Sequence, residues 1–239
     1  MSTTRSCWPN GILTFYDRST HERVLPLAPV VFMDDFLGKA IDTTTIWTLL
    51  DTAGGAEALV ADAPNGAVGL TLTNAVETQL AGLSWGDNRT LTLNQGLVAE
   101  FRSRFTTLPV NASTAVIGLA GDHNADIDVV AESAWFRWDA SGAVTVENDD
   151  TAAGHQTSKV ATGVTVLANG WHIYRIDCTT IADVKFYIDG EAVATGTTFN
   201  MSQVAALALQ PVARMDKAAD ALNLGVMEVD YVRCWQKRS

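Results

Sequence analysis

The stretch WHIYRIDCTTIADVKFYIDGEAV, residues 171–193, decides the fold of this chain. Its first part places Tyr174, Ile176 and Cys178 at alternate positions, with the polar residues Arg175 and Asp177 between them. Successive side chains of a β-strand point to opposite faces. The alternation therefore predicts a strand that has one face against a core.

The second part of the stretch repeats this pattern and then turns. Val184, Phe186 and Ile188 again occupy alternate positions, and the pair Asp189-Gly190 follows them. Asp and Gly adopt positive φ at low cost, as a two-residue hairpin turn requires. We therefore predict a strand, a short break, a second strand, and a tight turn into a third.

Strand patterns of the same kind fill residues 30–236. The clearest is at residues 97–105, where Leu97, Ala99 and Phe101 share one face and Glu100 and Arg102 share the other. Many short strands separated by Gly, Asn and Asp turns predict an all-β fold, an antiparallel β-sandwich that forms one domain over residues 30–239. Further strands are predicted at residues 57–61, 67–73, 115–120, 134–139, 144–148, 158–166, 207–213 and 226–236.

Length and composition agree with one large β domain. The chain has 239 residues, of which 47% are hydrophobic and 18% charged, enough apolar material for a sizeable core. Sixteen basic and 27 acidic residues give a net charge of −11, which excludes nucleic acid as the main partner because phosphate binding needs clustered Lys and Arg. We expect no membrane partner, since no apolar run is long enough for a membrane span or an export signal. Cys7, Cys178 and Cys234 are odd in number and far apart, so we predict no disulfides and folding in a reducing cytoplasm.

Three segments resemble the concanavalin A-like lectin/glucanase superfamily. They are DDFLGKAIDTTTIWT at residues 34–48, the stretch at residues 171–193, and MEVDYVRCWQ at residues 227–236, and they occur in the order that the superfamily has. The resemblance implies a jelly-roll sandwich. It leaves the function open, because the superfamily includes enzymes, sugar binders and structural modules.

Residues 1–29 differ from the rest of the chain. They hold three of its six prolines and show no sustained strand or helix period, so we predict an extended N-terminal arm. The arm carries the apolar residues Trp8, Phe15, Tyr16 and Leu25, which we predict to bind a partner. These side chains either pack on the chain's own sandwich or dock on another chain.

The arm and the start of the sandwich carry a second resemblance. The segment CWPNGILTFYDRSTHERVLPLAPVVFMDDF, residues 7–36, is similar to the start of small structural proteins of tailed bacteriophages. The resemblance implies a non-enzymatic virion structural protein, namely a capsid decoration or cement protein. It also implies synthesis in the host cytoplasm, assembly as a homo-oligomer, and binding to the major capsid protein or other virion proteins.

Two alternatives stay open, and the first is a glycoside hydrolase. The laminarinase-like enzymes of the superfamily use the motif E-x-D-x-x-E or E-x-D-x-E. The nearest match here runs from Asp126 through Asp128 to Glu132, but its first acid is Asp and its last acid comes one residue late. That departs from the arrangement that holds two carboxyls about 5–5.5 Å apart in retaining enzymes. We therefore favour an acidic loop and predict that the chain is not an enzyme.

The second alternative is a carbohydrate-binding module on the virion surface. It needs an exposed aromatic ring on a concave face, for which Trp85, Trp135 and Trp138 are the candidates. Trp135 and Trp138 are three residues apart, so in a regular strand they point to opposite faces. The four histidines are scattered without the spacing of a zinc site, and we predict no metal or cofactor.

The closing strand at residues 226–236 leaves two questions open. By resemblance, Asp230 would bind a structural calcium ion, as in some members of the superfamily. We favour the alternative, in which backbone donors satisfy this carboxylate. The core face is also undecided, because two sets compete: Met227, Val229 and Tyr231 against Val226, Val232 and Cys234.

Overall fold

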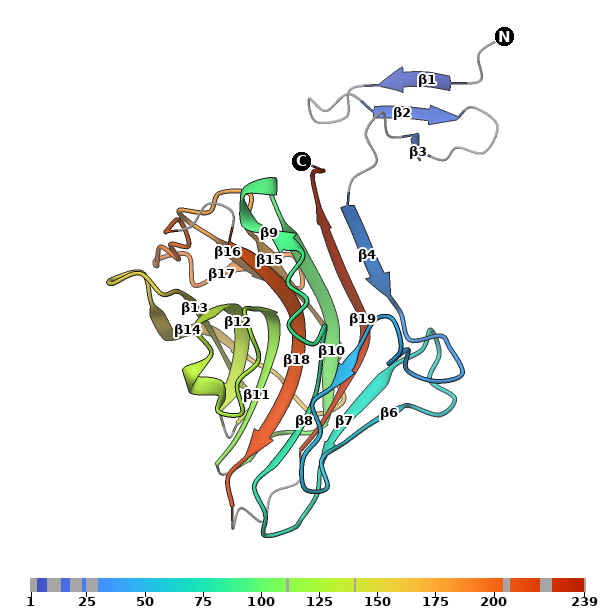
Figure 1. The fold of residues 1–239 in the computed structure, drawn as a ribbon, viewed down its shortest axis with the longest axis vertical. Coiled ribbons are helices and arrows are strands. Elements are labelled where there is room, and N and C mark those ends of the chain that lie inside the picture. Colours follow the sequence, from blue (N-terminus) through green and yellow to red (C-terminus); the bar gives the residue numbers. More distant parts are fainter. Residues whose placement is uncertain are drawn as a thin grey trace.

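The computed structural model describes residues 4–7, 14–17, 23–24, 30–110, 112–139, 141–203, 207–219 and 225–238. Figure 1 shows that most of them form two β-sheets packed face to face. This confirms the predicted all-β, antiparallel sandwich. The helices of the described residues are short, and none has the length and apolar character of a membrane span. They include the 3-10 turns η2 (Leu93–Gln95) and η3 (Ile127–Val129).

One sheet, which we call the convex sheet, has eight antiparallel strands. They are β4 (Val30–Asp34), β6 (Ala56–Leu59), β7 (Val68–Leu72), β10 (Val98–Thr107), β15 (His172–Asp177), β16 (Lys185–Ile188), β17 (Glu191–Val193) and β19 (Gly225–Gln236). Their order is β17-β16-β15-β10-β19-β7-β6, and β4 also pairs with β19. The last strand of the chain, β19, therefore lies inside the sheet, between β10 on one side and β7 and β4 on the other.

The second sheet, which we call the concave sheet, also has eight antiparallel strands. They are β5 (Thr48–Leu49), β8 (Gln79–Ser84), β9 (Leu91–Thr92), β11 (Ser113–Ala120), β12 (Glu132–Asp139), β13 (Ala143–Asp150), β14 (Thr157–Thr165) and β18 (Ala208–Lys217). Their order is β14-β13-β12-β11-β18-β8-β5, and β9 also pairs with β18. Both sheets bend the same way, so the outer face of this sheet is hollow (Figure 1).

A third, small antiparallel sheet has the order β1-β2-β3. The predicted partner-binding residues Trp8 and Leu25 lie outside the described residues, as do the side chains of Phe15 and Tyr16. The division into an arm and a sandwich domain stays a prediction. The bounds of the three strands are β1 (Thr4–Cys7), β2 (Thr14–Asp17) and β3 (Arg23–Val24).

The main core lies between the two large sheets. The predicted inward faces of β15 and β16 are buried, and Phe136 of β12 joins them to the opposite sheet. The ring of Phe136 lies 5.1 Å from Tyr174 and 5.4 Å from Phe186 between centroids. The predicted hairpin is also present: Asp189 and Gly190 have φ values of 53° and 86° and form the two-residue loop between β16 and β17.

A β-bulge in β19 settles which face of the closing strand is core. Tyr231 pairs with Arg102 and Val229 with Ser103, so Asp230 between them has no residue opposite it on β10. The extra residue turns the strand over. As a result, each of the two competing sets was right for only half of the strand. Met227 and Val229 are buried before the bulge, and Val232 and Cys234 after it.

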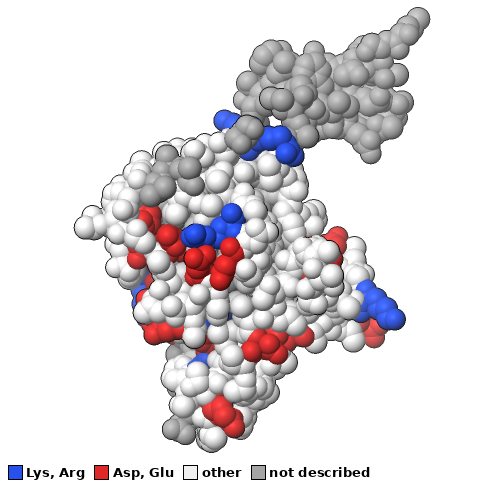
Figure 2. Space-filling view, in the orientation of Figure 1, with Lys and Arg blue, Asp and Glu red and all other residues white. Residues whose placement is uncertain are grey.

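On the face that Figure 2 shows, the charged side chains of the sandwich are spread rather than concentrated. Figure 2 shows acidic side chains in several separate places, with basic side chains next to some of them. The net charge of −11 is therefore not gathered into one acidic patch on this view. This distribution is typical of a charge that favours solubility.

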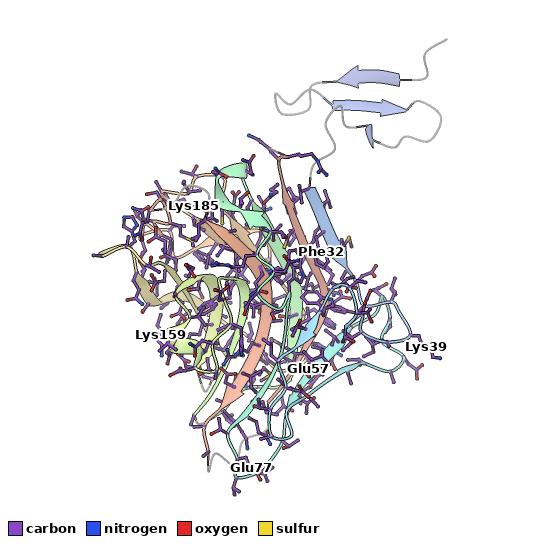
Figure 3. All side chains as sticks on the ribbon, viewed as in Figure 1. Phe32, Lys39, Glu57, Glu77, Lys159 and Lys185 are labelled. Atoms are coloured by element: carbon purple, nitrogen blue, oxygen red, sulfur yellow. The ribbon has the colours of Figure 1, made fainter. Side chains whose placement is uncertain are left out.

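Glu57 of β6, the edge strand of the convex sheet, connects the two sheets. Its carboxylate accepts a hydrogen bond from the backbone N–H of Gly82 in β8, across the side of the sandwich (Figure 3). Burial raises the pKa of Glu57 to about 7, the hydrogen bond from Gly82 opposes the rise, and the nearby charge of Asp51 adds to it. The folded protein therefore holds a proton here at a pH where the unfolded chain has released it.

This carboxyl gives a testable pH dependence. Because the folded pKa is raised, the contribution of Glu57 to stability falls as the pH rises from 4.5 to about 7. We expect Glu57→Gln to leave stability unchanged at pH 4 and to raise it by about 1 kcal/mol at pH 8, after allowance for solvent screening of a half-buried group. Urea unfolding at both pH values measures the effect. Glu77→Gln, the same charge change at an exposed site, is the control, and an equal gain there would contradict the assignment.

Candidate functional site

The hollow outer face of the concave sheet carries a loop that we call the strap, residues 121–131 between β11 and β12. Ile127, at its centre, is buried against the sheet in an apolar cluster that is separate from the main core. The other members of this outer cluster are Val116, Ala120, Trp135 and Val212. An apolar side chain pressed against these residues removes them from water and seats the strap on the sheet.

Arg137 of β12 binds the strap from the side of the concave sheet. Its side chain is 3% exposed and donates hydrogen bonds to Asp128 of the strap at 2.5 Å, to Asp139 at 2.9 Å and to Glu147 of β13 at 3.1 Å. Burial acts to lower the pKa of Arg137, but the hydrogen bond that it donates to Asp128 and the charges of the other carboxylates raise it above its usual value. The guanidinium is therefore charged and surrounded by its counter-ions.

Arg214 of β18 is the second buried arginine under the strap. It donates to the carbonyl oxygen of Asn124, and to the carbonyl oxygen of Ala125 at 2.5 Å. Its Nε donates to Asp216 at 2.7 Å. Burial lowers the pKa of His123, and the positive charge of Arg214 lowers it further. Two arginines on neighbouring parts of one face thus hold the strap through charge-assisted hydrogen bonds.

A cavity of about 230 Å³ opens on one side of the strap. Its walls come from the strap and from strands β12, β13 and β14. The side chains that give it its chemistry are Asp128, Trp135, Glu147, Asp149, Thr157 and Lys159. Carboxylates and hydroxyls in one small cavity are the groups that bind the hydroxyls of a polar ligand.

Glu147 is the most firmly held acid of the cavity. One carboxylate oxygen accepts from Trp135 Nε1 at 2.5 Å and from Arg137, and the other accepts from the backbone N–H of Lys159 at 3.3 Å. Asp149 follows two residues later in the same strand, so its side chain leaves the same face. Same-face neighbours in a strand lie about 6.6 Å apart at Cα, close enough for two carboxyls to act on one bond.

The structure does not bring the predicted acids Asp126, Asp128 and Glu132 into one site. Asp128 lines the cavity and is bound to Arg137, whereas Asp126 accepts from the backbone N–H of Asp128 and lines a different cavity. Glu132 lies at the start of β12 and faces Arg89 at 3.6 Å. The strand continues from Glu132 without a bulge that would gather the three carboxyls. The segment is the acidic loop that we favoured.

The three candidate tryptophans have three different positions. Trp138 is buried in the main core and Trp135 is on the opposite face, as their spacing predicted. Trp135 is 3% exposed beneath the strap, so its ring offers no open stacking platform. Trp85 is partly buried and packs edge-on against Phe32 with 4.9 Å between the centroids.

Asp230, the calcium candidate, accepts a hydrogen bond from Arg102. It is buried at the bulge, and an arginine takes the place of the backbone donors that we expected. Among the described residues, no three His, Cys, Asp or Glu side chains come together in a way that could hold a metal ion.

Glu147 and Asp149 are the site residues that the sequence analysis missed. Residues 144–148 were assigned only as a strand, and Asp149 directly follows them. Two acids at i and i+2 of a predicted strand share a face, and that signal was present in the sequence.

Comparison with known proteins identifies the fold. No protein-family model matches the chain, and no curated protein matches it. Solved structures do match. A β-1,3-glucanase from Mycobacterium marinum is 17% identical with a TM-score of 0.58, over 85% of this chain and 97% of that one. SCLam, a non-specific endo-β-1,3(4)-glucanase from family GH16, is 14% identical with a TM-score of 0.61, over 88% of this chain and 91% of that one.

A third similar structure is an immunostimulatory antigen and pseudo β-1,3-glucanase of Mycobacterium tuberculosis. It is 15% identical with a TM-score of 0.58, over 87% of this chain and 98% of the other. These likenesses correct the prediction that the chain is not an enzyme, because the sandwich is one that endo-β-glucanases use. That prediction rested on the acids of one loop and overlooked those of β13. The predicted virion role finds no support in the comparisons. The chain has the concanavalin A-like jelly-roll fold of the GH16 β-glucanases.

Proposed function

We propose that this chain is a carbohydrate-active protein of the glycoside hydrolase class, and that it takes a β-linked glucan in the cavity beside the strap. The observation that carries the proposal is the pair of same-face carboxylates, Glu147 and Asp149, in a cavity on the concave sheet. The solved structures that share this sandwich include endo-β-1,3-glucanases, which supports the choice of substrate class.

Each of the two acids would have a different role in hydrolysis. Glycoside hydrolysis uses one carboxyl to protonate the leaving oxygen and one carboxylate that acts at the sugar carbon or activates water. Glu147 suits the second role, because Arg137 and Trp135 hold one of its oxygens in place. Asp149, which lines the same cavity and is less buried, takes the first role.

The test is turnover and binding of laminarin and lichenan by the full chain. We expect Glu147→Gln and Asp149→Asn each to lower turnover by at least about tenfold, which corresponds to about 1.4 kcal/mol of transition-state stabilisation. Asp177→Asn is the matched control, since Asp177 lies on the convex sheet and its carboxylate accepts hydrogen bonds only from neighbouring Thr179 among the described residues. Thermal melts of all variants separate loss of activity from loss of folding.

Sugar binding without cleavage is the second candidate. The observation in its favour is that Glu147 already bonds to Trp135, Arg137 and the backbone, which leaves it few free lone pairs for chemistry. Binding of glucan with no release of reducing ends would support this candidate over hydrolysis. Absence of both binding and turnover would overturn the proposal. Assembly through residues 1–29, with virion proteins as partners, stays a separate prediction.

A further inference from the structure

The strap divides the hollow face of the concave sheet into two parts. On one side lies the cavity of about 230 Å³ that holds Glu147 and Asp149, and on the other a cavity of about 480 Å³ that is lined by Asp126 and Asp216. Ile127 contributes to the walls of both. The strap is therefore the partition between them.

Within the part of the chain that the structure describes, no passage runs beneath the strap. The space between it and the sheet measures about 10 Å³, room for at most about one water molecule. The base of the strap is closed by a hydrogen bond from the N–H of Gly121 to the carbonyl oxygen of Glu132 at 2.8 Å. Farther along, the N–H of His123 donates to Asp87 at 2.6 Å, which ties the strap to the loop after β8. A sugar chain cannot thread under this segment.

The strap is also held firmly where it crosses the sheet. Arg137 binds it through Asp128, and Arg214 binds it through two backbone carbonyls. Both arginines are buried, and breaking a buried charge-assisted contact leaves an uncompensated charge. Buried contacts thus fix the strap to the outer face of the concave sheet.

Building on the proposed function, we infer that the site takes the end of a β-glucan or a short oligosaccharide, and does not bind the interior of a long chain. A polymer bound at an internal unit needs a groove that is open on both sides of the cleavage point. The cavity here is smaller than the roughly 300–1,000 Å³ of sites for larger ligands, and one of its walls is the strap. The chain would therefore differ from the endo-acting glucanases that share its fold.

The experiment compares a sugar with ends and a sugar without them. Calorimetry of the full chain would use a linear β-1,3-linked glucotriose and a cyclic β-glucan, which has no chain end. We expect the cyclic glucan to bind at least about tenfold more weakly, and replacement of residues 123–130 by a short glycine linker to remove most of that difference. Ile127→Ser is a milder variant that loosens the strap, and Lys39→Gln, in the loop between β4 and β5, is the control (Figure 3).

The outcomes separate the inference from the proposal beneath it. Equal binding of the linear and cyclic sugars by the unaltered chain would overturn the inference and leave the proposed function standing. Failure to bind either sugar would overturn the proposed function, and the inference with it. If both strap variants stay folded by thermal melt and still reject the cyclic glucan, the strap is not the partition and the inference is wrong.

Discussion

Replacing Arg137 by leucine is expected to destabilise the sandwich by about 3–5 kcal/mol, because removal of one partner from a buried ion network leaves the others uncompensated. Glu147 is itself buried and would lose its positive partner, while Asp128 and Asp139 would lose a hydrogen bond each. Urea unfolding at neutral pH measures the change in the free energy of unfolding. The strap should loosen as well, since Arg137 holds it through Asp128.

Arg89 provides a matched control for this prediction. It also pairs with two acids, Asp122 at 3.1 Å and Glu132 at 3.6 Å, but its side chain is about one-third exposed. Exposed ion pairs contribute on the order of 0–1 kcal/mol, so Arg89→Leu should cost little. If Arg89→Leu and Arg137→Leu lower the free energy of unfolding by equal amounts, burial of the Arg137 network is not the reason that it stabilises the fold. A double change, Arg137→Met with Glu147→Leu, should recover part of the loss because no buried charge remains unpaired.

Replacing Phe136 by alanine is expected to cost about 3–5 kcal/mol. Phe136 belongs to the concave sheet, and its ring contacts Tyr174 and Phe186 of the convex sheet, so the truncation opens a cavity between the layers. The truncation also removes two edge-to-face or tilted ring contacts, and their loss adds to the free energy lost with the buried apolar ring. Denaturant unfolding with an unchanged slope would identify a change in stability rather than in the unfolded state.

Two comparisons test this second prediction. Phe136→Leu keeps most of the volume and should cost less than Phe136→Ala. Val76→Ala removes apolar atoms from a side chain that is 58% exposed, and should change stability by no more than about 0.5 kcal/mol. If Phe136→Ala costs as little as Val76→Ala, the rings at the centre do not hold the two sheets together.

The parts of the fold that could be predicted are the strands that have one buried face. β15 and β16 alternate strictly, so Tyr174 and Phe186 could be assigned to the core from their spacing alone. β8 was not predicted, because it does not have one buried and one exposed face. All six of its residues, QLAGLS, are buried, and a strand covered on both faces has no alternation to detect.

The bulge at Asp230 and the strap lie beyond what periodicity can show. A bulge adds one residue without changing the composition of the strand. The sequence of β19 therefore shows two possible core faces and no feature that selects one of them. The burial of Trp135 depends on a loop that folds back over it, held by Arg214 from a strand nearly eighty residues later in the chain. Glu147 and Asp149 could have been proposed from their spacing, but only their place beside the strap makes them a candidate pair.

The central positions of β18 and β19 have a consequence for how the protein is made. These are the last two strands of the described chain, yet β18 lies between β11 and β8, and β19 lies between β10 and β7. Until the ribosome has released residue 217 the concave sheet lacks its middle strand, and until it has released residue 236 the convex sheet lacks its own. Synthesis proceeds at about 5–20 residues per second, so the edges of β10 and β11 stay unpaired for several seconds. Unpaired edges are templates for pairing with other chains. We therefore expect the nascent chain to fold only after synthesis of its last strand, and to depend on protection from aggregation until then.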